Sequence, residues 1–383
     1  MVKCVLCKLH LLLFQLVLGL FGLLGICYDK CMVLKRSKSA AASPVHAPVT
    51  APAEGSAFEV TLRPKSLREY VGQTKIKGHL LMHIQAAISR KEPLGHTLLH
   101  GPPGLGKTTL AHILAREMQA QIRITSGPAL EKPGDLASIL SNLQQGDVLF
   151  IDEIHRLRPV VEEMLYAAME DYALDLVIGK GPTARSMRLT LKPFTLLGAT
   201  TKAGAMSAPL RDRFIHHFKL AFYELPEMQQ IVERSAQLLR VPLQSDAAHR
   251  IAKSSRATPR IANRLLRSVR DFAHVKGDAT VDRACVETTL HALDIDDRGL
   301  DATDRLILDA IVTMFAGGPV GLGTIAAVLA EEEDTVEDVY EPYLLQQGFL
   351  QRTPKGRMAT KKTYEALGMA VPEGAQATLF NGQ

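Results

Sequence analysis

The segment that most constrains this chain is residues 101–108, which read GPPGLGKT and form a complete phosphate-binding loop. A short apolar run at 97–99 precedes this loop. Apolar residues recur after it at helical spacing, at Leu110, Ile113, Leu114 and Met118. The loop is therefore expected to join a strand to a helix, and the chain is expected to contain a parallel α/β sheet.

The chemistry of this loop follows from its residue types. Glycines allow backbone N–H groups to converge on phosphate oxygens, and the start of the following helix adds positive potential. Lys107 is placed to neutralise β- and γ-phosphate charge, and Thr108 to bind Mg²⁺. The alternative, a glycine-rich turn whose lysine only caps a helix, does not explain the strand before it and the helix after it.

A second acidic site is expected about forty residues further on, where the chain reads DVLFIDEIH. Residues 148–151 form an apolar strand that ends in Asp152 and Glu153. Parallel strands end at one edge of the sheet, so both carboxylates should lie beside the phosphate loop. We expect Asp152 to hold Mg²⁺ through water and Glu153 to activate the attacking water.

Two further groups have more than one interpretation. The apolar strand at 194–201 ends in hydroxyls, and Thr200 either senses the γ-phosphate or closes the strand by a local hydrogen bond. In SAPLRDRF, Arg211 and Arg213 flank Asp212. They are either surface ion pairs, or one of them reaches the nucleotide of a neighbouring subunit and stabilises charge on the transferring phosphoryl group.

The rest of the chain suggests two smaller domains. Residues 226–297 read as helices throughout, and Arg260 falls in the first turn of one of them, where only a nearby anion would make a cation favourable. From 298 to 370, helical patterns at 302–315, 323–332 and 335–346 precede two short strands, which is the order of a winged helix. Residues 371–383 read as a tail.

Charge in the last domain is sharply divided. Residues 331–341 carry acidic side chains and no basic one, whereas 351–362 carry basic side chains and no acid. An acidic third helix would be repelled by DNA phosphates. We therefore expect the wing to bind the DNA backbone through Arg352, Lys355 and Arg357 without reading bases, and the alternative is a basic wing that faces solvent.

Residues 1–57 are unlike the rest of the chain. An apolar run at 11–27 is flanked by positive charge on both sides, and an Ala/Pro/Ser-rich linker follows at 37–57. The run is a membrane anchor, a secretory signal, or translated upstream sequence joined to a protein that begins at Met32, and we favour the last. Folded structure is expected from Phe58, with no membrane segment in the native protein.

Composition removes two simple interpretations. Residues 1–58 hold six Lys/Arg and two acidic residues, so they account for most of the net charge of +5, and overall basicity does not indicate DNA binding. Four of the five cysteines also lie in this leader, in pairs (4 and 7, 27 and 31) without turn residues that would close a metal site. Cys285 alone remains, which suits a reducing compartment.

The order of these parts resembles the AAA+ ATPases and, more narrowly, the RuvB family of Holliday junction branch migration motors. The matching stretches run from 58 to 370 without a large insertion. They are LRPKSLREYVGQ (62–73), HGPPGLGKTTLA (100–111), TSGPALEKPGDLA (125–137), DVLFIDEIHRL (147–157), SAPLRDRF (207–214), TPRIANRLLR (258–267) and EPYLLQQGFLQRTPKGRMAT (341–360). The resemblance implies an α/β AAA+ P-loop ATPase domain (58–225), a helical lid domain (226–297) and a C-terminal winged-helix domain (298–370).

The resemblance also implies roles for single residues. Those expected to contact ATP are Leu62, Arg63, Gly104, Gly106, Lys107, Thr108, Thr109, Glu170, Asp171, Tyr172, Arg213, Tyr223 and Arg260. Among them Arg213, rather than Arg211, corresponds to the arginine finger, whereas Tyr172 has packing as an alternative role. The chain departs from the family pattern at two places: Ile215-His216-His217 follows RDRF where the family commonly has Gly-Ile, and Lys202 replaces an arginine.

The implied function is that of an ATPase and DNA helicase-type motor. A homohexameric ring would hydrolyse ATP with Mg²⁺ and translocate duplex DNA at Holliday junctions, in cytoplasmic recombination, repair and the SOS response. The implied partners are RuvA, which would engage a hairpin at 174–191 with exposed apolar residues, and the RuvC resolvase. The alternatives are an ATP-controlled DNA-binding switch, as in replication initiators, and a clamp-loader-type AAA+ protein.

Overall fold

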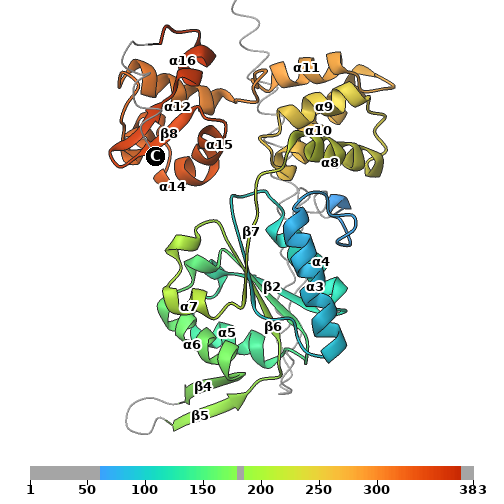
Figure 1. The fold of residues 1–383 in the computed structure, drawn as a ribbon, viewed down its shortest axis with the longest axis vertical. Helices are drawn as coiled ribbons and strands as arrows, with labels where there is room; N and C mark the ends of the chain where they lie inside the picture. The colour runs from blue at the N-terminus through green and yellow to red at the C-terminus, as the bar shows by residue number, and fades with distance from the viewer. Residues whose placement is uncertain (1–60, 179–184, 372–383) are drawn as a thin grey trace, which may run out of the picture. The chain divides into compact units, whose positions relative to one another are not determined.

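The computed structural model describes residues 61–178 and 185–371 (Figure 1). In these two ranges no helix combines the length and the apolar character that crossing a bilayer needs. The leader, the linker, the start at Phe58, the hairpin turn and the tail after residue 371 lie outside the described residues.

A five-stranded parallel sheet organises the first domain, with strand order β2-β3-β6-β1-β7. The strands are β1 (Thr97–His100), β2 (Ile122–Ser126), β3 (Val148–Asp152), β6 (Thr195–Thr200) and β7 (His216–Lys219). The three central strands β3, β6 and β1 are the apolar runs expected from the sequence. Their carboxyl ends bring Asp152, Thr200 and the phosphate loop to one edge of the sheet.

Side chains on the central strands alternate between two apolar clusters, because neighbouring strand residues point to opposite faces. On β3, Val148 and Phe150 belong to one cluster, and Leu149 and Ile151 to the other. Helices α3 (Thr74–Arg90) and α4 (Lys107–Glu117) cover the first face, and α5 (Pro133–Ser141), α6 (Pro159–Glu170) and α7 (Ala208–Asp212) contribute to the second, as Figure 1 shows. Short 3₁₀ turns are η1 (Gly127–Ala129), η2 (Ile154–Arg156) and η4 (Ala203–Ala205).

A separate hairpin follows α6 and is built from β4 (Ala173–Ile178) and β5 (Arg185–Thr190). The strands are antiparallel, and Leu174 lies opposite Leu189. Leu174 is buried, whereas Met187 on β5 is 46% exposed. The predicted hairpin is therefore present with the expected alternation in its described residues, and its expected turn at 179–182 lies outside them.

The second domain is helical, as expected. Its helices are α8 (Leu225–Leu238), α9 (Ser245–Lys253), α10 (Pro259–Lys276) and α11 (Arg283–Ala292). On α10 the buried stripe includes Leu265 and Val269, while Ile261 is only partly buried. Cys285 on α11 is buried in the same core and is the only cysteine in the described ranges.

The third domain has the order of a winged helix around its own apolar core. Its elements are α12 (Ala302–Thr313), α13 (Leu322–Leu329), α14 (Glu333–Thr335), η5 (Val336–Tyr340), α15 (Glu341–Gln346), β8 (Leu350–Thr353), β9 (Gly356–Ala359) and α16 (Lys361–Leu367). The expected third helix is thus a continuous acidic run whose middle turn, η5, is a π-helix. Strand β9 also pairs with Val320, which places the wing against the loop before α13.

Candidate active site

The phosphate loop has the backbone that its sequence predicts. Gly106 ends the loop at φ 96°, a left-handed value that favours glycine, and a Cβ there would lie 3.1 Å from the Tyr70 hydroxyl. Helix α4 then begins at Lys107, whose ammonium donates to the carbonyl oxygens of Gly101 (2.7 Å) and Pro102 (3.0 Å). The ammonium is therefore positioned by the loop itself.

The electrostatics around Lys107 suit an anion. Burial lowers the pKa of Lys107, and the carboxylates of Glu153 and Asp152 oppose this shift. A bound phosphate would favour the charged form of Lys107 in the same way. The charge of a triphosphate would therefore offset the free energy that the desolvation of Lys107 costs.

Two hard oxygen donors meet beside this lysine. The Thr108 hydroxyl donates to Asp152 Oδ2 across 3.3 Å, although the two residues are 44 positions apart in the sequence. A hydroxyl and a carboxylate are ligands that Mg²⁺ accepts, with water and phosphate oxygens completing the shell. The donor set at Thr108 and Asp152 therefore fits the predicted metal role.

Glu153 lies just past the end of β3 in a left-handed conformation, with φ 47°. Its Oε2 accepts a hydrogen bond from the Thr201 hydroxyl (3.2 Å) and lies 3.3 Å from His155 Nδ1. Burial lowers the pKa of His155 despite Glu153, so the imidazole is neutral near pH 7. The contact between these side chains is thus not an ion pair, and the hydrogen bond to the Glu153 carboxylate comes from Thr201.

The two threonines at the end of β6 differ in their partners. The Thr200 hydroxyl is fully buried, lies 2.9 Å from His155 Nδ1 and accepts from the backbone N–H of Lys202 (3.0 Å). Thr201, which the sequence analysis did not single out, is the one that contacts Glu153. Thr200 therefore acts on Glu153 through His155, whereas Thr201 acts directly.

Most predicted nucleotide residues line two adjoining pockets. The first is lined by Arg63, Pro103, Gly104, Gly106, Lys107, Thr108, Thr109, Asp152, Glu153, Pro259, Arg260 and Asn263. The second, more apolar pocket is lined by Leu62, Arg63, Pro64, Glu69, Tyr70, Val71, Gly106, Thr109, Tyr223, Ile231, Arg234, Ser235, Pro259 and Asn263. Tyr70, Arg234 and Asn263 were missed by the sequence analysis. Tyr70 could have been found, because it lies inside the motif at 62–73.

The lid closes these pockets from the second domain. The backbone N–H of Arg260, in the first turn of α10, lies 3.5 Å from the Gly104 carbonyl oxygen. The Tyr223 hydroxyl donates to the Leu105 carbonyl (3.2 Å) and contacts the Tyr70 hydroxyl (3.0 Å). Burial raises the pKa of Tyr223 to about 12, so this residue contributes a neutral hydroxyl.

Arg213 lies outside both pockets. Its guanidinium packs 4.4 Å above the Tyr166 ring, pairs with Glu170 (3.1 Å) and donates to the Pro209 carbonyl (2.8 Å). Its buried Nε has no partner among the described residues. Strand β7 begins at His216, after Phe214 and Ile215, and pairs with β1 through His216 and His217, so the His-His departure leaves the strand intact.

Asp171 and Tyr172, which the resemblance placed near nucleotide, also line neither pocket. Asp171 pairs with Arg188 of β5 at 2.8 Å. The Tyr172 ring packs edge-on against Phe194 at 5.8 Å, which matches the alternative packing role.

Three family models match successive parts of the chain. They are the Holliday junction DNA helicase RuvB P-loop domain (62–220), the RuvB AAA lid domain (223–296) and the RuvB C-terminal winged helix domain (297–368). The chain belongs to the RuvB family. The predicted fold class, a P-loop ATPase domain with a helical lid and a winged helix, is thereby confirmed.

Solved RuvB structures are similar over nearly their full length. The Thermotoga maritima RuvB Holliday junction branch migration motor is 51% identical, with a TM-score of 0.75, over 82% of this chain and 100% of that chain. A mutant of the same Thermotoga protein matches with 51% identity and a TM-score of 0.76, over 81% of this chain and 99% of that chain.

The three basic residues of the wing in this RuvB-family chain differ in their environments. Arg352 and Lys355 are exposed at the hairpin, as expected for DNA contacts. Arg357 is only 8% exposed, and its Nε and Nη2 donate to the two carboxylate oxygens of Glu341, at 2.9 and 2.8 Å. Arg357 therefore stabilises the domain in this structure, and its contact with DNA stays a prediction.

Proposed function

We propose that this chain is an ATP-driven motor of Holliday junction branch migration that works as a homohexameric ring on duplex DNA, in cytoplasmic recombination and repair. RuvA would deliver the ring to the junction, and the RuvC resolvase would act on the same junction. The three working parts would be residues 58–225, 226–297 and 298–370.

The observation that carries the proposal is the position of Arg213. The pocket around Lys107 has its own loop, acids and lid arginine, yet Arg213 is outside it, held by Tyr166 and Glu170. A guanidinium that is pre-positioned away from its own site can serve a site on an adjacent copy. Such a division of one site between two subunits requires a closed assembly and supports the ring.

The residues divide the hydrolytic step between them. Glu153 takes a proton from the attacking water while the new P–O bond forms at the γ-phosphorus and the bond to the β–γ bridging oxygen breaks. Lys107 and Arg260 offset charge on the phosphates, and Thr201 fixes the Glu153 carboxylate. Thr108 and Asp152 would hold Mg²⁺, which supplies charge neutralisation at the β- and γ-oxygens.

The electrostatics of the winged helix support a motor over a site-reading switch. The third helix is acidic and would be repelled from a major groove, whereas the exposed Arg352 and Lys355 suit backbone contacts that any sequence offers. The exposed Met187 on β5 supports the hairpin as the RuvA docking site.

The test is strand exchange on a synthetic four-way junction, with RuvA and ATP present, compared with ATP hydrolysis on linear duplex. The proposal expects exchanged arms that depend on both ATP and RuvA. Nucleotide-dependent DNA binding without strand exchange would instead favour the ATP-controlled switch or the clamp-loader-type protein.

A further inference from the structure

Lys202 joins the hydrolytic site to the winged helix. It follows Thr201 and Thr200, the last residue of β6. Its backbone N–H donates to the Thr200 hydroxyl at 3.0 Å, and the preceding residue, Thr201, donates to Glu153. A change in the position of the Lys202 side chain therefore affects the turn that positions Glu153. In the sequence, Lys202 stands out only as a departure from the family's usual arginine.

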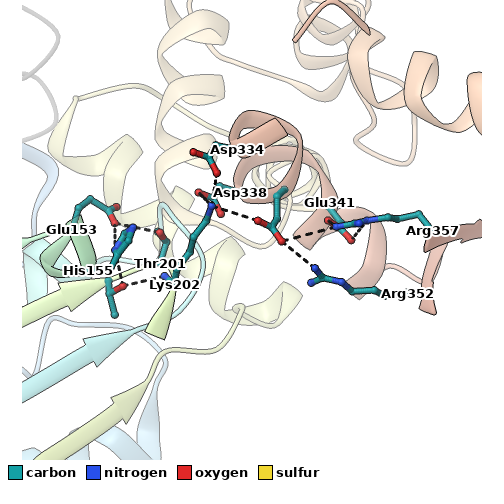
Figure 2. A network of polar contacts seen from close by, with 11 residues as sticks. Glu153, His155, Thr201, Lys202, Asp334, Asp338, Glu341, Arg352 and Arg357 are labelled. Carbon is teal, nitrogen blue, oxygen red and sulfur yellow. Dashed lines mark hydrogen bonds and ion pairs between the residues drawn. The ribbon is translucent and has the colours of Figure 1, made fainter. Parts of the chain in front are cut away.

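The Lys202 ammonium lies among three carboxylates of the acidic third helix, which we call the acidic segment (334–338). It is 2.7 Å from Asp334, 3.3 Å from Asp338 and 3.4 Å from Glu337, and Figure 2 shows it between the β6 turn and this helix. The hydrogen bond with Asp334 raises the pKa of Lys202, and the same bond lowers the pKa of Asp334. Lys202 and Asp334 therefore form an ion pair near neutral pH.

The same segment also engages the wing. Glu337 Oε1 accepts from Arg352 Nη2 at 3.0 Å, while Glu337 Oε2 is the atom near Lys202. The Glu337 carboxylate therefore bridges the cation of the ATPase domain and the proposed DNA contact of the wing. Burial alone would raise the pKa of Glu337, but the hydrogen bonds with Arg352 and Lys202 outweigh it and lower the value.

We propose that Lys202 is a positioning residue that latches the hydrolytic site to the acidic segment, and that duplex DNA opens this latch through Arg352. This inference rests on the proposed function. DNA phosphates compete with Glu337 for Arg352, and their charge repels the acidic segment. Binding of the wing to DNA and the contact of Lys202 with the acidic segment are therefore mutually unfavourable. When DNA binds, Lys202 leaves the acidic segment, and the turn that carries Thr201 and positions Glu153 is released for hydrolysis.

The first test measures kcat for ATP with and without linear duplex. Lys202→Ala and Asp334→Asn should raise kcat without DNA by about two- to fivefold, the scale of a partly exposed ion-pair cluster. With saturating duplex the rate should match that of the unaltered protein, so the stimulation by DNA shrinks. Lys202→Arg should keep the latch because it keeps the cation.

Matched controls remove a charge from the same domains outside the cluster. Lys192→Ala, whose ammonium donates to Gln144, controls for Lys202→Ala, and the exposed Asp309→Asn on α12 controls for Asp334→Asn. Neither control should change the ratio of the two rates.

The second test uses reciprocity. If DNA weakens the latch, loss of the latch must strengthen DNA binding. Lys202→Ala and Glu337→Gln should therefore tighten binding of a labelled duplex about two- to fivefold at low salt, measured by fluorescence anisotropy without nucleotide. A merely structural role for Lys202 would not tighten DNA binding.

Two results would overturn the latch. Unchanged rates and unchanged duplex affinity in Lys202→Ala and Asp334→Asn would mean that the contacts carry no coupling. Loss of hydrolysis in Lys202→Ala with and without DNA would make the lysine part of the chemistry instead. If the unaltered protein exchanges strands in the junction assay and these variants have the same rates and affinities, only the latch proposal is wrong. If the unaltered protein neither hydrolyses ATP nor exchanges strands, the proposed function itself is wrong.

Discussion

Glu153 shows how much a single residue depends on the backbone that carries it. It is a non-glycine residue at φ 47°, a conformation that costs free energy and persists only where the surroundings enforce it. This backbone turns the side chain away from the strand direction and toward Thr201. The strain is therefore consistent with a catalytic position, and substitution should affect chemistry more than binding.

Glu153→Gln should retain ATP binding and lose hydrolysis, because the amide keeps the shape and cannot accept the proton. A loss of about 100-fold or more in kcat is expected for removal of a general base. Phosphate release and binding of a fluorescent ATP analogue measure the two properties separately. Glu163→Gln, an exposed change on α6, is the matched control, and full phosphate release from the Glu153 variant would contradict the assignment.

Arg213→Ala should also bind nucleotide and fail to hydrolyse it, with a loss in kcat of about 1,000-fold or more, as for other arginine fingers. Because the arginine is proposed to act on an adjacent copy, mixing this variant with a Lys107→Ala variant should restore part of the ATPase rate. The rate is measured across mixing ratios at constant total protein. Absence of rescue at every ratio would argue against action between subunits.

The sequence predicted the phosphate-binding and acidic residues of the site, which belong to short contiguous motifs. It missed Tyr70 and Asn263 although they lie inside such motifs, and it missed Arg234, which lies outside them and reaches the pocket by long-range packing. Lys107, Asp152 and Arg260 meet in one pocket as expected. The choice between Thr200 and Thr201 was not predictable, because it depends on which hydroxyl faces the Glu153 carboxylate. A strand pattern indicates the end of β6 but not the direction of the turn after it.

At the scale of elements, the wing and the third helix form one unit. In the sequence the third helix is acidic and the wing is basic. In the structure Glu341, only 3% exposed, closes on Arg357, and Glu337 closes on Arg352. Arg352 and Arg357 lie directly opposite each other on β8 and β9, so strand alternation does not distinguish them. They differ in the fold because Arg357 closes on the buried Glu341, whereas Arg352 stays exposed beside Glu337.

Arg357→Ala should destabilise the winged helix, because it leaves the buried Glu341 carboxylate unpaired. Breaking a buried pair in this way costs about 3–5 kcal/mol. Arg352→Ala should change stability by less than about 1 kcal/mol and instead weaken DNA binding, with a shallower salt dependence. Chemical unfolding and duplex binding distinguish them; equal stability of the two variants would contradict the buried role of Arg357.

At the scale of the whole molecule, a buried contact between one arginine and two aspartates joins the loop before α10 to α12. Arg256 pairs with Asp301 and Asp304, and Asp304 is completely buried. Burial raises the pKa of Asp304 from 3.8 to about 7, although the charge of Arg256 opposes the shift. The folded protein therefore holds a proton on Asp304 that the unfolded chain has already lost above pH 4.

This pKa shift predicts a pH dependence with a definite sign. Its stabilising contribution is complete below about pH 4 and is lost as the pH rises through about 7. Asp304→Asn removes the titration, so the Tm of the unaltered protein minus that of the variant should fall between pH 4 and pH 7 and then level off. Differential scanning calorimetry at constant ionic strength measures this difference. A Tm difference that rises over the same range would show that Asp304 is ionised in the fold.

The arrangement of the whole chain was more predictable than its contacts. The order of strands, helices and wing follows from hydrophobic periodicity and turn residues, which act over ten or twenty positions. The contact of Lys202 with Asp334 joins residues more than a hundred positions apart and has no local signal. Exposed ion pairs of this kind leave no periodic pattern, so only the three-dimensional structure reveals them.

The buried Cys285 offers a practical route to watching the proposed motor at work. Burial raises the pKa of its thiol, so it reacts slowly with maleimides, and the other four cysteines precede Met32. In a chain shortened to start at Met32, a cysteine at an exposed position such as Asp309 would be the readily labelled thiol. A single fluorophore per subunit could then report the movement of individual rings along a tethered junction.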